Sequence, residues 1–293
     1  MTAHALNETE KWRTVRFDVL ERIEEMPSLS RVVTEFLALA RRDVYSARDF
    51  EAVLSKDQAL VARLLKLANS GIYGRSRTVR TIPEAVVLIG LEHLKKVVYA
   101  VSAAGLVRHA LRHYGYHPDQ GFWLHGLAVA QAARVVAEAS RSCPLRPEEA
   151  YVAGLLHDVG KLVIDEFLDL PAGSHATVDQ ERDAVGLDHA ELAEYILHQW
   201  NLPEAITASV RWHHDHTAGG DAALGAAALH LGEVICRRWR VGYERPIDLG
   251  EDVPQEDCAE VMEMLGIPPT AWGQVIWDIR QRLVTLEDTY AGA

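Results

Sequence analysis

The sequence contains few cysteines and no long apolar run. Its three cysteines, Cys143, Cys236 and Cys258, are far apart and form no CxxC pair, which argues against a disulfide framework and favours a reducing compartment. The longest apolar runs, such as residues 85–90 and 97–106, are far short of the ~20 residues that cross a bilayer. Residues 1–8 also lack an apolar core of signal-peptide length. We therefore expect a soluble, cytoplasmic protein with no membrane role.

Positive charge is also scarce. The chain has 30 Lys and Arg residues against 42 Asp and Glu residues, a formal net charge of −12. Most of such a surface would repel a phosphate backbone, which disfavours general nucleic-acid binding. With 293 residues, of which 48% are hydrophobic and 25% charged, the composition is that of a globular protein with room for about two units of ~150 residues.

Helical periodicity dominates the sequence and no segment shows convincing strand alternation, so we predict an all-α protein. Ser46-Ala-Arg-Asp49 and Asp188-His-Ala-Glu191 are capping boxes that mark two helix starts. Asp57 is expected to cap another helix, and Thr81-Ile-Pro-Glu84 to open one. The expected helices of the second half are 122–139, 147–167, 188–200, 203–213 and 221–240, with a short helix within 168–186 and tail helices around 262–265 and 271–286.

These segments predict two tightly joined helical lobes with an extension at each end. Residues 1–21 form a lead-in and residues 22–110 a first helical lobe. Residues 111–240 form a second helical lobe, and residues 241–293 a C-terminal helical extension. The second lobe opens with a short segment rich in His, Tyr and Gly.

Histidine occurs 14 times, and its positions on the second lobe form a pattern. His157 and Asp158 interrupt the strongly apolar segment 155–164, where burial of two polar groups without partners would be costly. A bound metal ion is one way to satisfy both. His125 falls in line with apolar residues at helical spacing, so it should also face inward. Helix ends can bring ligands from several segments to one point, and three more histidines stand at such ends: His189, His213 and His214.

Imidazole nitrogens and a carboxylate are suitable ligands for Zn, Fe, Mn or Ni. One Asp can bridge two such ions while separate histidines complete each coordination sphere. A dinuclear centre of that kind generates hydroxide at neutral pH and holds a phosphate oxygen, which suits phosphoester hydrolysis. The alternative for His157 and Asp158 is a hydrogen-bonded buried pair that only preserves an inherited fold. Each of the other histidines, taken singly, would be a core, capping or surface residue.

Longer motifs run through both halves of the chain. In the second half they are Gly154-Leu-Leu-His-Asp-Val-Gly-Lys-Leu162, Asp188-His-Ala-Glu191 and Trp212-His-His214. In the first half they are Met26-Pro-Ser-Leu29, residues 57–70, Ile72-Tyr-Gly74 and residues 81–91. Together with His125, these residues resemble the HD superfamily of metal-dependent phosphohydrolases and, more narrowly, the HDOD (HD-related output domain) proteins. The resemblance covers about residues 22–236 and leaves the tail after about residue 240 outside.

The resemblance implies an N-terminal helical lobe packed on an HD-type, metal-binding helical lobe. It also implies a bacterial signalling or regulatory role, often without demonstrated catalysis. Position by position, it implies a divalent transition-metal site of one or two ions with ligands at His125, His157, Asp158, His189, His213 and His214. Asp158 would bridge the two ions, and Lys161 would contact a phosphate or shuttle a proton.

Two features depart from the family pattern. Where the last HD helix normally supplies an Asp, this chain offers Glu233, which can ligate a metal although its extra methylene moves the carboxylate; the neighbouring His230 could substitute. After His213 and His214, residues 215–221 lack the Gly-Tyr-Pro signature of the HD-GYP phosphodiesterases. Hydrolysis of cyclic di-GMP therefore loses its best sequence support.

Two functional hypotheses follow. In the first, the chain is a regulatory module whose second lobe holds a metal or ligand and whose first lobe presents a helical surface to a signalling protein. In the second, Asp158 and Lys161 serve an active phosphohydrolase on a nucleotide or cyclic nucleotide, with the polar loop 215–221 at the edge of the cleft. We favour the first as the biological role and leave turnover open.

Overall fold

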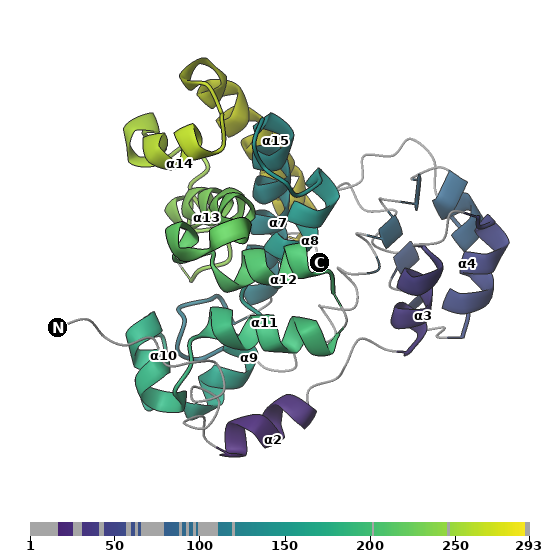
Figure 1. Ribbon diagram of the computed structural model, residues 1–293, viewed down its shortest axis with the longest axis horizontal. Helices are drawn as coiled ribbons and strands as arrows, with labels where there is room; N and C mark the ends of the chain where they lie inside the picture. The colour runs from purple at the N-terminus through teal and green to yellow at the C-terminus, as the bar shows by residue number, and fades with distance from the viewer. Residues whose placement is uncertain are drawn as a thin grey trace.

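The computed structural model describes residues 17–25, 31–40, 44–56, 60–61, 64–65, 79–87, 90–91, 94–95, 98, 111–118, 121–200, 202–244 and 247–290. Every regular element in these ranges is a helix (Figure 1), and extended pairing is limited to two isolated bridges, Tyr114 to His175 and Tyr116 to Tyr243. The prediction of an all-α protein is confirmed. No helix within the described ranges is both long and apolar enough to cross a membrane.

Three helices are described at the start of the chain: α2 (Phe17–Glu25), α3 (Arg31–Leu39) and α4 (Ala47–Leu54). The predicted capping box opens α4, since the backbone N–H of Asp49 donates to Ser46 Oγ (3.3 Å) and that of Ser46 donates to Asp49 Oδ2 (2.7 Å). Phe36 of α3 and Phe50 of α4 are fully buried, with ring centroids 5.3 Å apart. The helix expected after Asp57 falls mostly outside the described residues, whereas residues 82–87 are helical as expected after Thr81.

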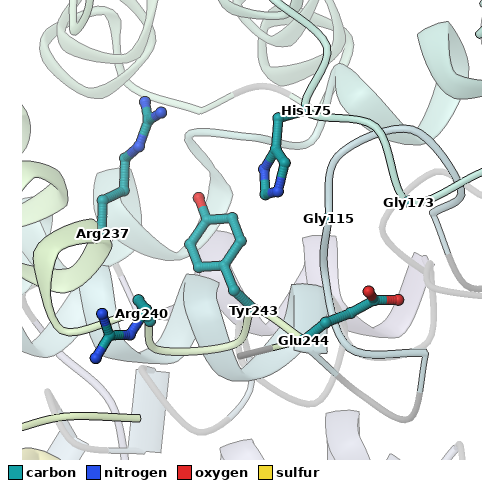
Figure 2. A pocket seen from close by; sticks show the side chains of 7 residues that line it. All are labelled: Gly115, Gly173, His175, Arg237, Arg240, Tyr243 and Glu244. Atoms are coloured by element: carbon teal, nitrogen blue, oxygen red, sulfur yellow. The ribbon is translucent and has the colours of Figure 1, made fainter. Parts of the chain in front are cut away.

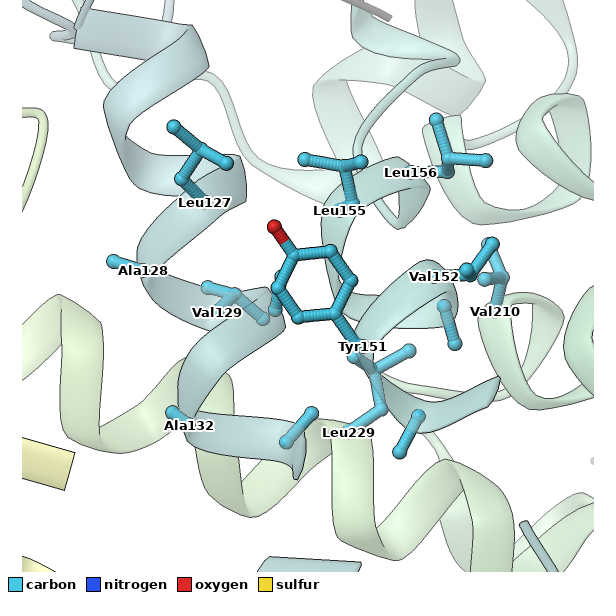
Figure 3. Packing of buried hydrophobic residues seen from close by; sticks show 14 of the residues in the cluster. Leu127, Ala128, Val129, Ala132, Tyr151, Val152, Leu155, Leu156, Val210 and Leu229 are labelled. Atoms are coloured by element: carbon cyan, nitrogen blue, oxygen red, sulfur yellow. The ribbon is translucent and has the colours of Figure 1, made fainter. Parts of the chain in front are cut away.

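The second half of the chain is built around α7 (Gly121–Ala139), which is buried along most of its length. It packs on α8 (Pro147–Leu156), α13 (Ala223–Arg238) and α15 (Trp272–Tyr290). Because neighbours cover α7 on several sides, it is apolar nearly all round rather than amphipathic. Figure 3 shows Tyr151 of α8 among Leu127 of α7 and Leu229 of α13, all of them buried.

The helix predicted over residues 147–167 is not continuous, and this prediction is wrong. α8 ends at Leu156, residues 157–160 form a turn, and α9 (Lys161–Ile164) and η2 (Asp165–Phe167) follow. Tighter i→i+3 hydrogen bonds replace the helical ones, such as Lys161 N to Asp158 O at 2.9 Å. A Cβ on Gly160 would lie 2.2 Å from the carbonyl oxygen of His189. The glycine therefore lets this turn sit directly against the start of the next long helix.

The remaining helices agree with the predicted pattern. They are α10 (Val178–Val185), α11 (His189–Gln199), α12 (Glu204–Arg211) and α14 (Ala259–Met264), with short 3₁₀ turns η3 (His216–Ala218), η4 (Gly220–Ala222), η5 (Gln255–Cys258) and η6 (Pro269–Ala271). The second predicted capping box opens α11, where the N–H of Glu191 donates to Asp188 Oδ1 at 2.8 Å. The C-terminal extension packs on α7, helped by an ion pair of 2.9 Å between Arg282 and Glu138.

The limits of the four predicted segments stay a prediction. Residues 1–16 of the lead-in and residues 99–110, at the end of the first lobe, lie outside the described residues. The helix α2 runs from residue 17 to residue 25, across the junction expected at residue 21. It contacts α9, and Arg22 of α2 forms an ion pair with Glu166 next to α9.

Candidate metal centre

The predicted ligand residues come from three helices and from the turns after two others, and they meet in the interior of the second lobe. His125 lies on α7, His157 and Asp158 lie on the turn after α8, and His189 is the first residue of α11. His213 and His214 follow α12, and Glu233 lies on α13. All are buried except His214, whose side chain is 27% exposed. Three overlapping groups have ligand atoms within 4.8 Å of one another: His189–His213–His214, His125–His157–Glu233 and His157–Asp158–His213.

The backbone sets the tautomers of three of these histidines. Nδ1 of His125 lies 3.1 Å from the carbonyl oxygen of Val241. Nδ1 of His157 lies 2.8 Å from that of Gly154, and Nδ1 of His213 lies 2.6 Å from that of Val210. Because a carbonyl oxygen can only accept, each Nδ1 carries the proton and donates it. Each Nε2 is then left with a lone pair, which is the form that binds a metal.

Four buried polar atoms of the centre have no hydrogen-bond partner in the described part of the chain. They are Nε2 of His125, His157 and His213, and Oδ1 of Asp158. A buried polar group without a partner costs about 1–3 kcal/mol, so four in one place require an explanation. A divalent transition metal accepts imidazole and carboxylate donors of this kind, and the residues present therefore fit such an ion.

The carboxylate of Asp158 lies between the rings of His189 and His157. Its Oδ1 is 3.3 Å from Nε2 of His189, while Oδ2 is 3.3 Å from Nε2 of His157. The two oxygens differ in their hydrogen bonds. Oδ2 accepts from the ammonium of Lys161 (2.7 Å) and from the hydroxyl of Tyr116 (2.6 Å), whereas Oδ1 has no such bond among the described residues. Lys161 thus joins the centre through Asp158.

Burial and neighbouring charges keep most of the centre in a form that binds metal. Burial lowers the pKa of His125 to about 3 and that of His214 to about 4, and it places the pKa of His213 well below its usual value. At His157 burial acts in the same direction, but the Asp158 carboxylate outweighs it and raises the pKa. Burial opposes ionisation of Asp158, yet His157 and Lys161 hold its pKa well below the usual range. Neutral imidazoles and an ionised carboxylate are the metal-binding forms.

Glu233 lies inside the cluster and His230 does not. Glu233 is 3% exposed, and its Oε2 is 3.8 Å from Nε2 of His213. Burial opposes its ionisation, but the surrounding histidines lower its pKa below the usual range. His230 instead directs Nδ1 to the backbone carbonyl of His213 at 2.9 Å, and its ring lies 4.8 Å from that of His216 at a tilt of 39°. Of the two candidates, Glu233 is therefore the one that lies among the other predicted ligands.

Glu181 is a residue of the site that the sequence did not reveal. It lies on α10, is 1% exposed, and accepts from Nδ1 of His189 at 2.7 Å and from its backbone N–H at 2.8 Å. Tyr114 adds a hydrogen bond of 2.9 Å. A carboxylate behind a histidine holds the ring and directs its other nitrogen toward a metal. Nothing local separates Glu181 from Asp179 and Asp183, which lie on the same short helix.

Two tyrosines also join the site without having been predicted. Tyr116, whose hydroxyl binds Asp158, stacks on Tyr243 with ring centroids 5.0 Å apart at 22°. Tyr243 also meets the ring of His125 edge-on at 5.4 Å. The only available signal was compositional, because Tyr116 belongs to the segment rich in His, Tyr and Gly that opens the second lobe.

Comparison with known proteins identifies the family. The HDOD domain model matches residues 26–216, and the chain therefore belongs to the HDOD domain family. The chain is also similar to an uncharacterized protein of Treponema pallidum (strain Nichols), with 28% identity over 212 residues. The match covers 67% of this chain and 39% of that protein, so the chain spans well under half the length of this curated relative.

Solved structures share the fold. An HDOD domain protein of unknown function from Geobacter sulfurreducens matches with a TM-score of 0.70 at 24% identity, over 93% of this chain and 96% of that one. A proposed signal transduction protein from Marinobacter aquaeolei VT8 gives 0.71 at 19%, over 96% and 63%. A proposed phosphohydrolase from Shewanella amazonensis SB2B gives 0.66 at 22%, over 91% and 98%. At these identities the likeness is one of fold.

Proposed function

We propose that the chain is a bacterial signalling protein whose HDOD domain holds divalent transition-metal ions at the buried centre. The observation that carries this proposal is the set of four buried donor atoms without hydrogen-bond partners in the described part of the chain, three imidazole nitrogens and one carboxylate oxygen, in one cluster. The family membership and the names of two relatives, one a proposed signal transduction protein and one a proposed phosphohydrolase, agree with it.

The donor arrangement favours two ions of unequal affinity. His189, His213 and His214 form one set, which faces the free Oδ1 of Asp158. His125, His157 and Glu233 form the other set, on the side of Oδ2. Because Oδ2 already accepts two hydrogen bonds, an ion on that side competes with Lys161 and Tyr116. We therefore expect the first ion to bind more tightly than the second.

Elemental analysis tests the metal proposal. The full chain is purified without chelator and without a histidine tag, with iron and manganese protected from loss, beside a double variant His157→Ala/Asp158→Ala. We expect up to two transition-metal ions per chain, and none in the double variant. A folded wild-type protein that contains no transition metal, and that takes up none of Mn²⁺, Fe²⁺, Zn²⁺ or Ni²⁺ on dialysis, would contradict it.

The signalling role is supported by a contact between α2 and α9, the short helix that begins at Lys161. Lys161, which binds Asp158, is the first residue of α9. Glu166 lies in η2, which follows α9 directly. Glu166 pairs with Arg22 of α2. Metal binding that changes the Lys161–Asp158 contact would therefore reach α2 through the short segment formed by α9 and η2. We expect amide hydrogen exchange in α2 to change when metal is added; identical exchange with and without metal would argue against this coupling.

A second candidate function is hydrolysis of a phosphate ester, favoured by the buried ammonium of Lys161. When bound, the ions would supply Lewis acidity that lowers the pKa of water and polarises a phosphoryl oxygen. Burial opposes charge on Lys161, but Asp158 outweighs it and raises the lysine pKa, so Nζ is protonated at neutral pH. Nζ can then bind a phosphoryl oxygen or give a proton to a leaving alkoxide. Tyr116 holds the carboxylate that positions it.

Turnover is tested with bis(4-nitrophenyl) phosphate and 3′,5′-cyclic mononucleotides in the presence of Mn²⁺. We expect Asp158→Asn and Lys161→Met to abolish hydrolysis without unfolding the protein. Lys56→Met is the matched control, because Lys56 is not part of the cluster and forms its ion pair with Glu35 at the surface. Equal activity in Asp158→Asn would refute the hydrolase function and leave the metal-binding function standing.

A further inference from the structure

An open pocket of about 590 Å³ adjoins the metal centre (Figure 2). It is lined by two glycines and by His175, Arg237, Arg240, Tyr243 and Glu244. The lining comes from three separate parts of the chain: the segment that opens the second lobe, the loop after η2, and the end of α13 with the turn that follows. Its volume lies within the range of about 300–1,000 Å³ that is typical of small-molecule sites.

The pocket is preformed by backbone hydrogen bonds. The N–H of Gly173 donates to the carbonyl of Arg112 (2.7 Å), and that of Ala176 donates to the carbonyl of His113 (2.8 Å). On the other side, the N–H of Glu244 donates to the carbonyl of Gly115 (3.0 Å). The segment 112–115 therefore holds both the loop that contains Gly173 and the turn that contains Glu244. A ligand would not have to order these walls, which lowers the free-energy cost of binding.

Two residues belong to both the pocket and the metal centre. Tyr243 lines the pocket and contacts the rings of Tyr116 and His125. Arg237 lines the pocket and lies 3.5 Å from Oε1 of Glu233 through Nη1. A molecule held in the pocket is therefore next to the cluster of metal ligands.

All five side chains that line the pocket, those of His175, Arg237, Arg240, Tyr243 and Glu244, carry a polar group. In Figure 2 the hydroxyl of Tyr243 points between the side chains of Arg237 and His175, while the carboxylate of Glu244 lies on the other side of the pocket. The side chain of Arg237 is 59% exposed, so its guanidinium can meet a ligand. Arg240 pairs with two carboxylates, those of Asp248 and Glu251, each at 3.4 Å, whereas Arg237 has a single ion pair among the described residues, with Glu233, and is more exposed. One end thus suits an anion, and the other suits hydrogen-bond donors.

We propose that this pocket binds a phosphate ester that also carries hydrogen-bond donors, as a nucleoside monophosphate does. The phosphate lies at Arg237, Tyr243 and His175, since a guanidinium and a hydroxyl donate to phosphate oxygens. The sugar hydroxyls or a base amino group donate to Glu244. The inference deepens the proposed function and rests on it for the role of the metal centre, next to which the phosphate is held.

Isothermal titration of the purified full chain with 5′-AMP and 5′-GMP tests the pocket. We expect Arg237→Gln to weaken binding of a nucleotide about ten- to hundredfold, because one charge-assisted contact is lost. Arg238→Gln is the matched control: the neighbouring arginine on α13 pairs with Glu251 and Asp257, outside the pocket, and its loss should leave binding unchanged. Glu244→Gln should weaken nucleotide binding while leaving the affinity for inorganic phosphate unchanged.

Loss of Arg237 could also change binding indirectly, by removing its ion pair with Glu233, so a second variant is needed. Tyr243→Phe keeps the ring packing, removes the hydroxyl and should also weaken nucleotide binding. Undisturbed nucleotide binding in both folded variants, or the absence of any nucleotide binding by the wild-type protein, would overturn the inference. Metal content measured on the same samples separates the two proposals. Metal without nucleotide binding overturns the pocket alone, whereas nucleotide binding that depends on Arg237 in a protein without metal supports the pocket and overturns the metal centre.

Discussion

Glu181 offers a direct test of whether the buried histidines bind metal. Its carboxylate accepts hydrogen bonds from Nδ1 of His189 at 2.7 Å, from the backbone N–H of His189 at 2.8 Å and from the hydroxyl of Tyr114 at 2.9 Å. The substitution Glu181→Gln keeps the size and shape of the side chain and removes its negative charge. If His189 ligates a metal, its imidazole becomes a weaker and less well oriented ligand. We expect metal affinity to fall about 10–100-fold, as when other carboxylates behind a ligating histidine are removed.

The structure also sets the accompanying effect on stability. A tenfold to hundredfold loss of affinity corresponds to about 1.4–2.7 kcal/mol of binding free energy. Glutamine retains one oxygen acceptor but places an amide N–H₂ where the second oxygen accepted a hydrogen bond. At least one hydrogen bond to a charged group is therefore lost in a fully buried place. This loss should lower the free energy of unfolding of the metal-free protein by about 1.5–3 kcal/mol.

The assay is a competition titration of Zn²⁺ or Mn²⁺ against a chromophoric chelator, with urea unfolding of the metal-free protein measured in parallel. Glu138→Gln removes the same charge from the surface of α7, where Glu138 pairs with Arg134 and Arg282, and it should change neither metal affinity nor the centre. A folded Glu181→Gln protein with wild-type metal affinity would show that His189 is not a ligand, and the reasoning from the orientation of its ring would fail.

Three further predictions concern the stability of the second lobe. Metal at one hundred times its dissociation constant should raise the free energy of unfolding by about 2.7 kcal/mol, so that addition of a chelator lowers the melting temperature; an unchanged temperature would contradict binding to the folded state. Gly154→Ala should cost about 1–3 kcal/mol in urea unfolding, since its Cβ would lie 2.7 Å from the Cα of Ala130, while Gly273→Ala, with nothing within 4 Å, should be nearly neutral. Finally, burial lowers the pKa of three cluster histidines, while Asp158 raises that of His157 against the effect of burial. As the pH falls through about 6.5, the unfolded chain therefore binds more protons at these three histidines than the folded chain does, and the metal-free protein should lose stability between pH 7 and pH 5; a flat profile in that window would refute this.

Local signals predicted most helices well. The two capping boxes mark the starts of α4 and α11, because a Ser or Asp side chain satisfies free N–H groups wherever the first turn forms. Pro203 is the N-cap of α12, one residue before its first turn. Each of these signals depends on three or four neighbouring residues, so it can be recognised in the sequence without knowing how the rest of the chain packs. The helix predicted over 147–167 is interrupted at a turn whose Gly160 packs directly against His189, 29 residues further on, and such a distant contact leaves no local signal.

The candidate ligands could be found because their types and spacing are unusual. A His-Asp pair inside an apolar segment is conspicuous, and the resemblance extended it to His125, His189, His213, His214 and Glu233. The structure brings all of these into one buried cluster. Their roles in holding metal stay a prediction. Glu181 could not be found in this way, because an acidic residue on a polar helix has no distinctive pattern around it.

Short-range chemistry thus decided the helical class of this protein, the starts of several helices and the types of side chain available for a metal. Helix periodicity, capping and the cost of burying polar groups act within a few residues or on each residue singly, so they can be recognised in the chain alone. Only the tertiary structure decided that Glu181 lies behind His189, that Tyr116 and Lys161 share Oδ2 of Asp158, and that a polar pocket adjoins the centre. The hydrogen bonds join residues up to 42 positions apart, and the pocket brings together residues between Gly115 and Glu244, so both depend on how whole helices pack.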